Sequence, residues 1–355
     1  MKVNKIIAGV MAVCVMGFGI PYVNTVAENN SVITASAEEE TEYTEGTYEL
    51  LTYKNYGDYI EISDCDESAT EVVIPAEIDG VSVMCIGDNA FGWCKDLISV
   101  EIPDSIKSIG RKAFSACSSL TSVEIPDSVT SIGYGAFIDC INLRSVKMSN
   151  SITSIADAIF NSCGQLASVN IPDGVTSIGR SAFYMCSSLK SVELPESLTS
   201  IEELAFSWSG LTSVKIPESV KSIGESAFYY SVLKSITILN PECDIFANFA
   251  TISNGYTSFN GTIYGYENST AQKYAEKYGY KFELIGNAPE KTTVTGDING
   301  DNSVNIADAV LLQSYILGKQ ELTEEQYKNA DLTGDGFVDS FDLVLLRREI
   351  IEDNK

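Results

Sequence analysis

Residues 125–147 read "IPDSVTSIGYGAFIDCINLRSVK", and close copies of this phrase fill the middle of the 355-residue chain. Beginning at residue 102, four units of 23 residues are followed by two units of 22, and a looser, longer copy begins at residue 74. A phrase that returns at a fixed period is typical of a protein built from stacked structural repeats. The sequence therefore predicts about seven stacked units.

The pattern within a unit predicts how the units stack. Leu120, Val123 and Ile125 lie on one face of a short strand, while the residues between them face solvent. A single unit cannot bury that apolar face, whereas stacked neighbours pair their strands in a parallel ladder and complete a shared core. We therefore expect an α/β-type repeat solenoid with a parallel β ladder and short turns.

The repeated phrase resembles the BspA-like leucine-rich repeats, which carry "IP-x-S-V-T-S-I-G-x-x-A-F-x-x-C-x-x-L". The resemblance covers roughly residues 48–284, and it departs from the pattern where Met148 and Ser149 replace Ile-Pro. The two 22-residue units each lack one residue after their phenylalanine, Phe206 and Phe228. The resemblance implies a leucine-rich repeat fold.

A solenoid of this kind needs a cap at each end to cover its core. We expect the repeats at 74–238, preceded by a linker and a β-hairpin cap at 38–73 and followed by a C-terminal cap at 239–286. A polar linker at 287–295 then leads to a segment of different character at 296–355.

The N-terminus has the layout of a secretory signal peptide. Lys2 and Lys5 precede an apolar run at 6–20, and the small residues 35–37 read "ASA". We expect cleavage after residue 37, which gives a secreted, extracellular protein with no membrane attachment. An uncleaved anchor is the alternative interpretation.

Charge and composition exclude several classes of function. The chain has 23 Lys and Arg against 49 Asp and Glu, a net charge of -26, which disfavours nucleic acid and anionic membranes as partners. The absence of histidine excludes Ser-His-Asp and Cys-His catalysis. The acidic residues of the repeats recur at turn positions such as Asp104, Asp127 and Asp173, and no catalytic motif is present. The sequence favours a protein that is not an enzyme.

A column of cysteines recurs every 23 residues and has two interpretations. It forms either a metal or redox ladder, or a row of small buried apolar side chains. We favour burial, because zinc sites cluster their ligands in patterns such as C-x-x-C. A Cys65–Cys85 disulfide is conceivable outside this column, which consists of Cys94, Cys117, Cys140, Cys163 and Cys186.

The ligand of the repeats is left open between a protein and a glycan. The solvent-facing strand position carries residues of both charge signs, and aromatic residues gather at the turns instead. Trp208, Tyr229 and Tyr230 have the chemistry to stack on sugar rings or on a protein, although packing against the shortened turns is the simpler interpretation.

Two acidic loops follow the repeats, "DINGDNSVNIAD" at 297–308 and "DLTGDGFVDSFD" at 331–342. Calcium takes six to eight oxygen ligands, and a 12-residue loop supplies them from positions 1, 3, 5, 7, 9 and 12. The sequence therefore predicts two Ca²⁺ ions. The ligands of the first loop are Asp297, Asn299, Asp301, Ser303, Asn305 and Asp308. Those of the second loop are Asp331, Thr333, Asp335, Phe337, Asp339 and Asp342.

The duplicated loop, each copy running into an apolar helix, resembles a type I dockerin. Three features depart from an ordinary EF-hand: Asp at position 12, Asn302 at position 6 of the first loop, and no helix entering before Asp297. The resemblance implies a small all-α domain of two loop-helix units that binds a cohesin domain of a scaffoldin.

The resemblance also implies which residues contact the cohesin. They lie at loop positions 10 and 11 and further along each helix. Because the two units differ there, we expect one dominant docking orientation. The candidates are Ile306, Ala307, Gln313, Ser314, Ser340, Phe341, Arg347 and Arg348.

These features together predict a secreted, non-catalytic interaction protein in a cellulosome that degrades extracellular polysaccharide. Two alternatives stay open: an O-glycosyl hydrolase with an unrecognised active site, and a cell-surface adhesin. Two carboxylates about 5 to 10 Å apart in a cleft would favour the hydrolase.

Overall fold

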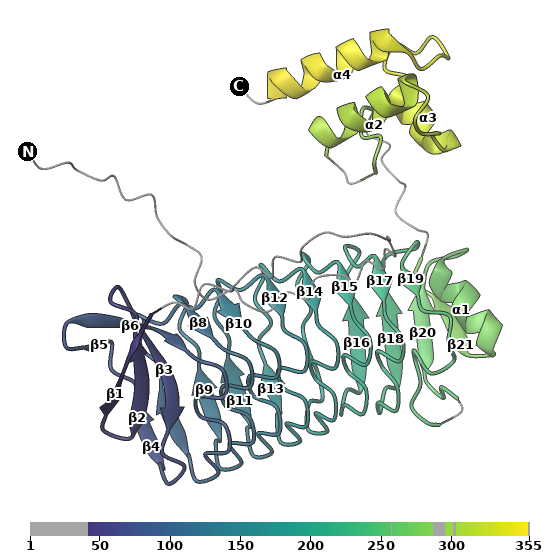
Figure 1. Ribbon diagram of the computed structural model, residues 1–355. Helices are drawn as coiled ribbons and strands as arrows, with labels where there is room; N and C mark the ends of the chain where they lie inside the picture. The colour runs from purple at the N-terminus through teal and green to yellow at the C-terminus, as the bar shows by residue number, and fades with distance from the viewer. Residues whose placement is uncertain (1–41, 257, 287–294, 301–302, 354–355) are drawn as a thin grey trace, which may run out of the picture. The chain divides into compact units, whose positions relative to one another are not determined.

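The computed structural model describes residues 42–256, 258–286, 295–300 and 303–353 (Figure 1). The chain divides into two compact units, Met1–Asn287 and Ala288–Lys355, and each is described by itself. The expected signal peptide, the linker up to residue 294 and the expected ligand Asp301 lie outside the described residues.

The first unit begins with an antiparallel meander that leads into a parallel sheet. Strand β1 (Thr44–Tyr48) pairs with β2 (Leu51–Asn55), and β2 pairs with β3 (Ile60–Cys65), in both cases antiparallel. Strand β3 then pairs in parallel with β6 (Val81–Ile86), which also pairs antiparallel with β5 (Glu77–Ile78). The change to parallel pairing marks the entry to the repeats.

The expected parallel ladder runs along the "S-V-x" position of the repeats (Figure 1). Ser122 lies opposite Ser145, and Ser145 lies opposite Ser168. Each strand therefore pairs with the same position of the next repeat. The prediction of a parallel-strand solenoid is confirmed. Its strands are β4 (Glu71–Val73), β7 (Ser99–Glu101), β9 (Ser122–Glu124), β11 (Ser145–Lys147), β13 (Ser168–Val169), β16 (Ser213–Ile216), β18 (Ser235–Ile238) and β20 (Thr262–Gly265).

A second parallel ladder, which the sequence analysis did not predict, runs along the "T-S-I-G" position. Its strands are two residues long, too short to show an alternating pattern. Most repeats therefore contribute to both ladders, although residues 191–193 form no strand at the "S-V-x" position. The strands are β8 (Ser108–Ile109), β10 (Ser131–Ile132), β12 (Ser154–Ile155), β14 (Ser177–Ile178), β15 (Ser200–Ile201), β17 (Ser222–Ile223) and β19 (Asp244–Ile245).

The core between the ladders is a set of columns of buried side chains, one of which consists of phenylalanine alone. The phenylalanine column is fully buried, and neighbouring rings stack with centroids 4.8 to 5.8 Å apart. This spacing is close to the distance between adjacent strands, so each ring rests on the ring of the previous repeat. The column consists of Phe91, Phe114, Phe137, Phe160, Phe183, Phe206 and Phe228.

The turns of each repeat hold residues in the left-handed backbone region. Ala116 has φ 57°, and its N–H donates to the carbonyl oxygen of Ile138 in the next repeat. The same position is occupied in other repeats by Asp139, Ser162 and Trp208, also at positive φ. Non-glycine residues are uncommon at positive φ, so the stacking of the repeats imposes this conformation whatever the side chain.

A helix covers the last repeat. Helix α1 (Thr270–Tyr278) begins at the N-cap Ser269, ends at Gly279 with φ 70°, and buries Ala271, Tyr274 and Ala275. Strand β21 (Lys281–Leu284) then pairs in parallel with β20 and ends the sheet.

The described residues of the second unit form three helices, α2 (Ile306–Ile316), α3 (Glu324–Ala330) and α4 (Ser340–Asp353). Helices α2 and α4 each follow one acidic loop directly. Val304 and Val338, at position 8 of the two loops, are half-buried against the core of this unit. The core residues are Ile298, Ala309, Leu312, Ala330, Leu346 and Ile350.

Candidate functional site

The first acidic loop is folded around two buried carboxylates. Asp308 is fully buried, and its Oδ1 accepts hydrogen bonds from the backbone N–H groups of Ile298 (2.8 Å) and Asn299 (2.9 Å). Its Oδ2 accepts one from the N–H of Asn305 at 2.9 Å. The carboxylate of Asp297, also buried, accepts one from Gly300 at 2.8 Å. The hydrogen bonds from Ile298 and Asn299 to Asp308 join the start of the loop to its end.

The second loop repeats this arrangement 34 residues later. Asp342 is fully buried, and its carboxylate accepts hydrogen bonds from the N–H groups of Thr333 (2.9 Å) and Asp339 (2.8 Å). Asp331 accepts hydrogen bonds from Asp335 (3.2 Å) and Gly336 (2.9 Å). The position-12 carboxylates are therefore held in a similar way in the two loops, whereas the position-1 carboxylates accept from different loop positions.

The buried carboxylate of the second loop stays ionised. Burial by itself raises the pKa of Asp342, but hydrogen bonds from Asp339, Thr333 and Leu332 outweigh it and lower the pKa below its usual value. A buried anion is costly unless a cation or several donors compensate it. Several donors compensate Asp342, which is therefore in the ionised form that a calcium ligand requires.

The remaining expected ligands line the loops with oxygen atoms. Asn305 accepts a hydrogen bond from the N–H of Ala307 and caps α2. Asp335 and Asp339 accept from Phe337 and Phe341, respectively. A donor set made only of carboxylate, amide, hydroxyl and carbonyl oxygens suits calcium. Within the described residues, which leave out Asp301, no three acidic or cysteine side chains converge closely enough to hold an ion.

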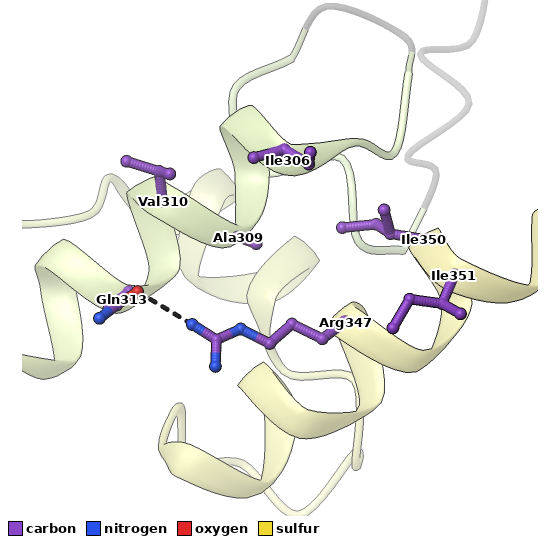
Figure 2. Close-up of a pocket in the computed structure, with 7 residues that line it drawn as sticks. All are labelled: Ile306, Ala309, Val310, Gln313, Arg347, Ile350 and Ile351. Atoms are coloured by element: carbon purple, nitrogen blue, oxygen red, sulfur yellow. Dashed lines mark hydrogen bonds between the residues drawn. The ribbon is translucent and has the colours of Figure 1, made fainter. Parts of the chain in front are cut away.

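An apolar groove lies between α2 and α4 (Figure 2). It has a volume of about 600 Å³. Ile306 and Val310 line it from α2 and Ile351 lines it from α4; all three are exposed, Ile306 to 71%. Across the groove, Nη2 of Arg347 donates a hydrogen bond to Oε1 of Gln313 at 3.0 Å, drawn as a dashed line in Figure 2. The groove thus has an apolar lining and one polar bridge.

Three of the expected cohesin-contacting residues lie on this groove: Ile306, Gln313 and Arg347. Ala307, Ser314, Ser340, Phe341 and Arg348 are not among its lining residues. The Nε of Arg348 donates to Glu352 at 2.8 Å. The hydroxyl of Ser314 donates to the carbonyl oxygen of Val310 at 2.8 Å. Three of the eight expected residues therefore line the groove, and the other five do not.

Four lining residues were not predicted from the sequence: Ala309, Val310, Ile350 and Ile351. Ile306 and Val310 are four residues apart on an exposed helix face, and this spacing is a signal that the sequence contains. Ile350 and Ile351 gave no comparable signal, because only the packing of α4 beside α2 brings them to the groove.

The cysteine column lies in the core of the repeats. All five of its thiols are free and fully buried, and Sγ of Cys140 donates to the carbonyl oxygen of Phe114 at 3.0 Å. Burial raises the pKa of Cys163 and Cys186. The interpretation as buried apolar positions is confirmed. Cys65 and Cys85 form no disulfide, so the bridge considered between them is wrong.

In the parts of the chain that the structure describes, no helix combines the length and the apolarity that a membrane crossing requires.

Comparisons with solved structures find similar repeats. A leucine rich cell surface protein from Faecalibacterium prausnitzii A2-165 is 35% identical, with a TM-score of 0.51 over 55% of this chain and 54% of that chain. The match thus spans about half of that protein's length. The leucine rich repeat protein of T. pallidum is 24% identical, with a TM-score of 0.46 over 68% of this chain and 98% of that chain. No curated protein matches the sequence.

Two family models match separate parts of the chain. The model for the BspA type leucine rich repeat region matches residues 84–209 and 153–255, with six copies. The model for the dockerin type I domain matches residues 295–351. A dockerin implies a cohesin partner, and leucine-rich repeats are interaction modules. The chain therefore combines BspA-type leucine-rich repeats with a type I dockerin domain.

Proposed function

We propose that this protein is a non-catalytic component of an extracellular, cohesin-based assembly of the cellulosome type. The dockerin docks on a cohesin domain of a scaffoldin, and the repeats present a binding surface. The observation that carries this proposal is the exposed apolar groove between α2 and α4, in a unit that matches the dockerin family. Membership of a polysaccharide-degrading assembly is part of the proposal and follows from the dockerin alone.

Two calcium ions, one in each loop, belong to the proposed docking state. A bound ion supplies positive charge beside the buried carboxylates of Asp308 and Asp342. Backbone N–H groups already donate hydrogen bonds to these carboxylates in the first turn of α2 and in the first turn of α4. We expect occupied loops to fix the two helices that form the groove.

The groove has the composition of a docking site. Its exposed apolar residues, Ile306, Val310 and Ile351, give a centre that loses contact with water when a partner covers it. The Gln313–Arg347 bridge supplies polar contacts beside that centre. Because Arg347 is already held by Gln313, it loses less conformational entropy on docking than a free arginine would.

The 34-residue duplication offers a second, symmetry-related surface that is less suited to docking. Ser340 takes the place of Ile306 there, and Leu317 takes the place of Ile351. A polar residue therefore stands where the groove has its most exposed isoleucine. This difference supports one dominant docking orientation.

Calorimetric titration tests the proposal. The full chain is titrated with a panel of recombinant type I cohesins, in excess calcium and in excess chelator. We expect at least one cohesin to bind in calcium with a Kd of about 1 µM or lower, and no binding in chelator. Binding to none of the panel in calcium, or equal binding in chelator, contradicts the proposal.

A matched pair of variants tests the groove itself. Ile306→Asp places a charge in the groove, whereas Ser340→Asp places the same charge at the equivalent position of the other unit. We expect Ile306→Asp to weaken cohesin binding about a hundredfold or more, because a buried unpaired charge is costly. Ser340→Asp should change the affinity less than about threefold. The reverse ranking would assign docking to the other surface.

A further inference from the structure

Three aromatic rings gather at the last repeats of the solenoid. Trp208 stacks on Tyr230 with centroids 4.0 Å apart, and Tyr230 packs against Tyr256 at 4.5 Å. A hydrogen bond between the two tyrosine side chains raises the pKa of Tyr230. Tyr256 is 62% exposed and Trp208 is half-buried. The three rings, called here the aromatic platform, form one continuous surface feature.

A small recess adjoins the platform. Its volume is about 220 Å³, and Trp208 lines both the recess and the platform. The other lining side chains are uncharged, and most carry a hydroxyl or amide group. They include Asn161, Ser181, Tyr184, Ser207 and Tyr229. The recess thus combines ring faces with hydrogen-bonding groups.

The fold of the repeats does not require these aromatic residues. Trp208 and Tyr230 occupy the left-handed turn position, with φ 58° and 53°. Ala116, Asp139 and Ser162 occupy the same position in other repeats that stack in the same way. Positive φ is more unfavourable for a bulky residue than for a small one. Two large rings at such a position indicate a use other than packing.

We propose that the aromatic platform and its recess bind a neutral oligosaccharide. A pyranose ring stacks its C–H face on the platform, and its hydroxyl groups bond to Asn161, Ser181 and the tyrosine hydroxyls beside the recess. The inference rests on the proposed role of the repeats as a binding surface, and names its ligand class. It does not depend on the dockerin.

Size and charge favour a sugar over a protein. A stable protein interface takes about 800 Å² from each partner, far more than three rings and a small recess provide. Arg180 and Glu203 directly precede the lining residues Ser181 and Leu204 in the sequence and form an ion pair at 2.9 Å. A protein partner that covered a wider area would have to remove water from this ion pair, which is costly. The lining carries no cation, and the chain has a net charge of -26, so an acidic polysaccharide is disfavoured.

The chain has two tryptophans, Trp93 and Trp208, which makes fluorescence a selective test. Trp93 occupies the same turn position in the first repeat, is 60% exposed, and lies beside Lys95 instead of another aromatic ring. In the full chain, Trp93→Phe leaves Trp208 as the only tryptophan. We expect its emission to change saturably with cellohexaose, xylohexaose or mannohexaose, with a Kd of about 1 mM or lower.

Two matched variants complete the test. Trp208→Phe leaves Trp93 as the reporter, and its emission should not change with any of the three sugars. Added to Trp93→Phe, Tyr256→Ala should weaken sugar binding about tenfold, whereas Tyr134→Ala, an exposed tyrosine in another repeat, should leave it unchanged.

Three results would overturn the inference. They are no saturable change at Trp208 with any of the three sugars, an equal change in Trp208→Phe, and an unchanged affinity in Tyr256→Ala with an unchanged circular dichroism spectrum. Cohesin binding should be the same in every one of these variants. Failure of the sugar site therefore leaves the docking proposal intact, and loss of cohesin binding leaves the sugar site intact.

Discussion

The repeat that contains Phe137 and the loop-helix unit that contains Asp342 are both short modules that recur along the chain, but their interiors differ. The repeat buries Phe137 and Cys140 completely, against identical side chains of its neighbours. The loop-helix unit buries Leu346, but it also buries the carboxylate of Asp342. The interior of the repeat is apolar, whereas the interior of the loop-helix unit also contains a buried carboxylate.

This difference teaches where each unit obtains its stability. Carboxylates of the repeats also accept backbone hydrogen bonds, as Asp127 does from Asn150 at 2.8 Å, but Asp127 stays exposed to water. The solenoid therefore needs no counter-ion. In the dockerin unit, by contrast, Asp308 and Asp342 are fully buried beside a small apolar core. We therefore expect the binding of calcium to contribute to the folding free energy of this unit.

The largest expected effect of a single substitution is in the phenylalanine column. Phe137→Ala removes a ring that stacks on Phe114 and Phe160, and should lower the free energy of unfolding of the solenoid by about 3–5 kcal/mol. Tyr134→Ala, at an exposed position of the same repeat, should change it by less than about 0.5 kcal/mol. Urea denaturation of the full chain measures both. Equal effects would contradict an apolar core built from columns.

A smaller effect is expected for the buried carboxylate of the second loop. Asp342→Ala leaves the N–H groups of Thr333 and Asp339 without their acceptor, at a cost of about 1–3 kcal/mol to the dockerin unit even without calcium. Loss of a ligand should also weaken calcium binding, which titration calorimetry measures. Asp127→Ala, which removes an exposed acceptor in the solenoid, should leave calcium binding unchanged. Undiminished calcium affinity in Asp342→Ala would refute the ligand assignment.

The cysteine column gives a pH dependence to the solenoid alone. Burial raises the pKa of Cys163 and Cys186 above the ordinary value of 9.0, so the folded state keeps them protonated where the unfolded state ionises. The stability that these protonated thiols contribute to the folded solenoid is fully present below pH 9.0 and is lost as the pH rises above it. Between pH 8 and pH 10 the loss should be about 1.4 kcal/mol per thiol. Urea denaturation at both pH values measures it, and Cys163→Ala with Cys186→Ala should flatten the dependence.

The smallest expected effect concerns the two arginines of α4. Arg347 lines the groove and Arg348 does not, so Arg347→Ala should weaken cohesin binding about threefold at low salt, and Arg348→Ala should have no effect. Titrations at low and high salt should show the difference shrink as salt increases. An equal loss from both variants would place the contact outside the groove.

The sequence was sufficient for those parts of the fold that repeat. The alternation around Val123 predicted the first ladder, and the recurrence of Cys140 every 23 residues predicted a buried column. It was insufficient for the second ladder, because two-residue strands such as Ser131–Ile132 show no period. A disulfide between Cys65 and Cys85 was also conceivable from sequence, since a list of cysteines holds no distances.

The candidate sites divide in the same way. Positions in the acidic loops follow from their spacing, and both position-12 carboxylates, Asp308 and Asp342, accept backbone hydrogen bonds in the structure. The groove depends on how α2 packs beside α4, so Ile350 and Ile351 were not predictable from their own helix. Contact of the groove with a cohesin and the binding of two calcium ions stay predictions.

Scanning calorimetry of the full chain, in excess calcium and in excess chelator, tests most directly the claim that the two units differ in their need for calcium. We expect two transitions. The one belonging to the solenoid should be the same in both conditions. The transition of the dockerin unit should fall by about 15 °C or more in chelator, or disappear. A calcium-independent dockerin transition, or a solenoid transition that shifts with calcium, would contradict the account.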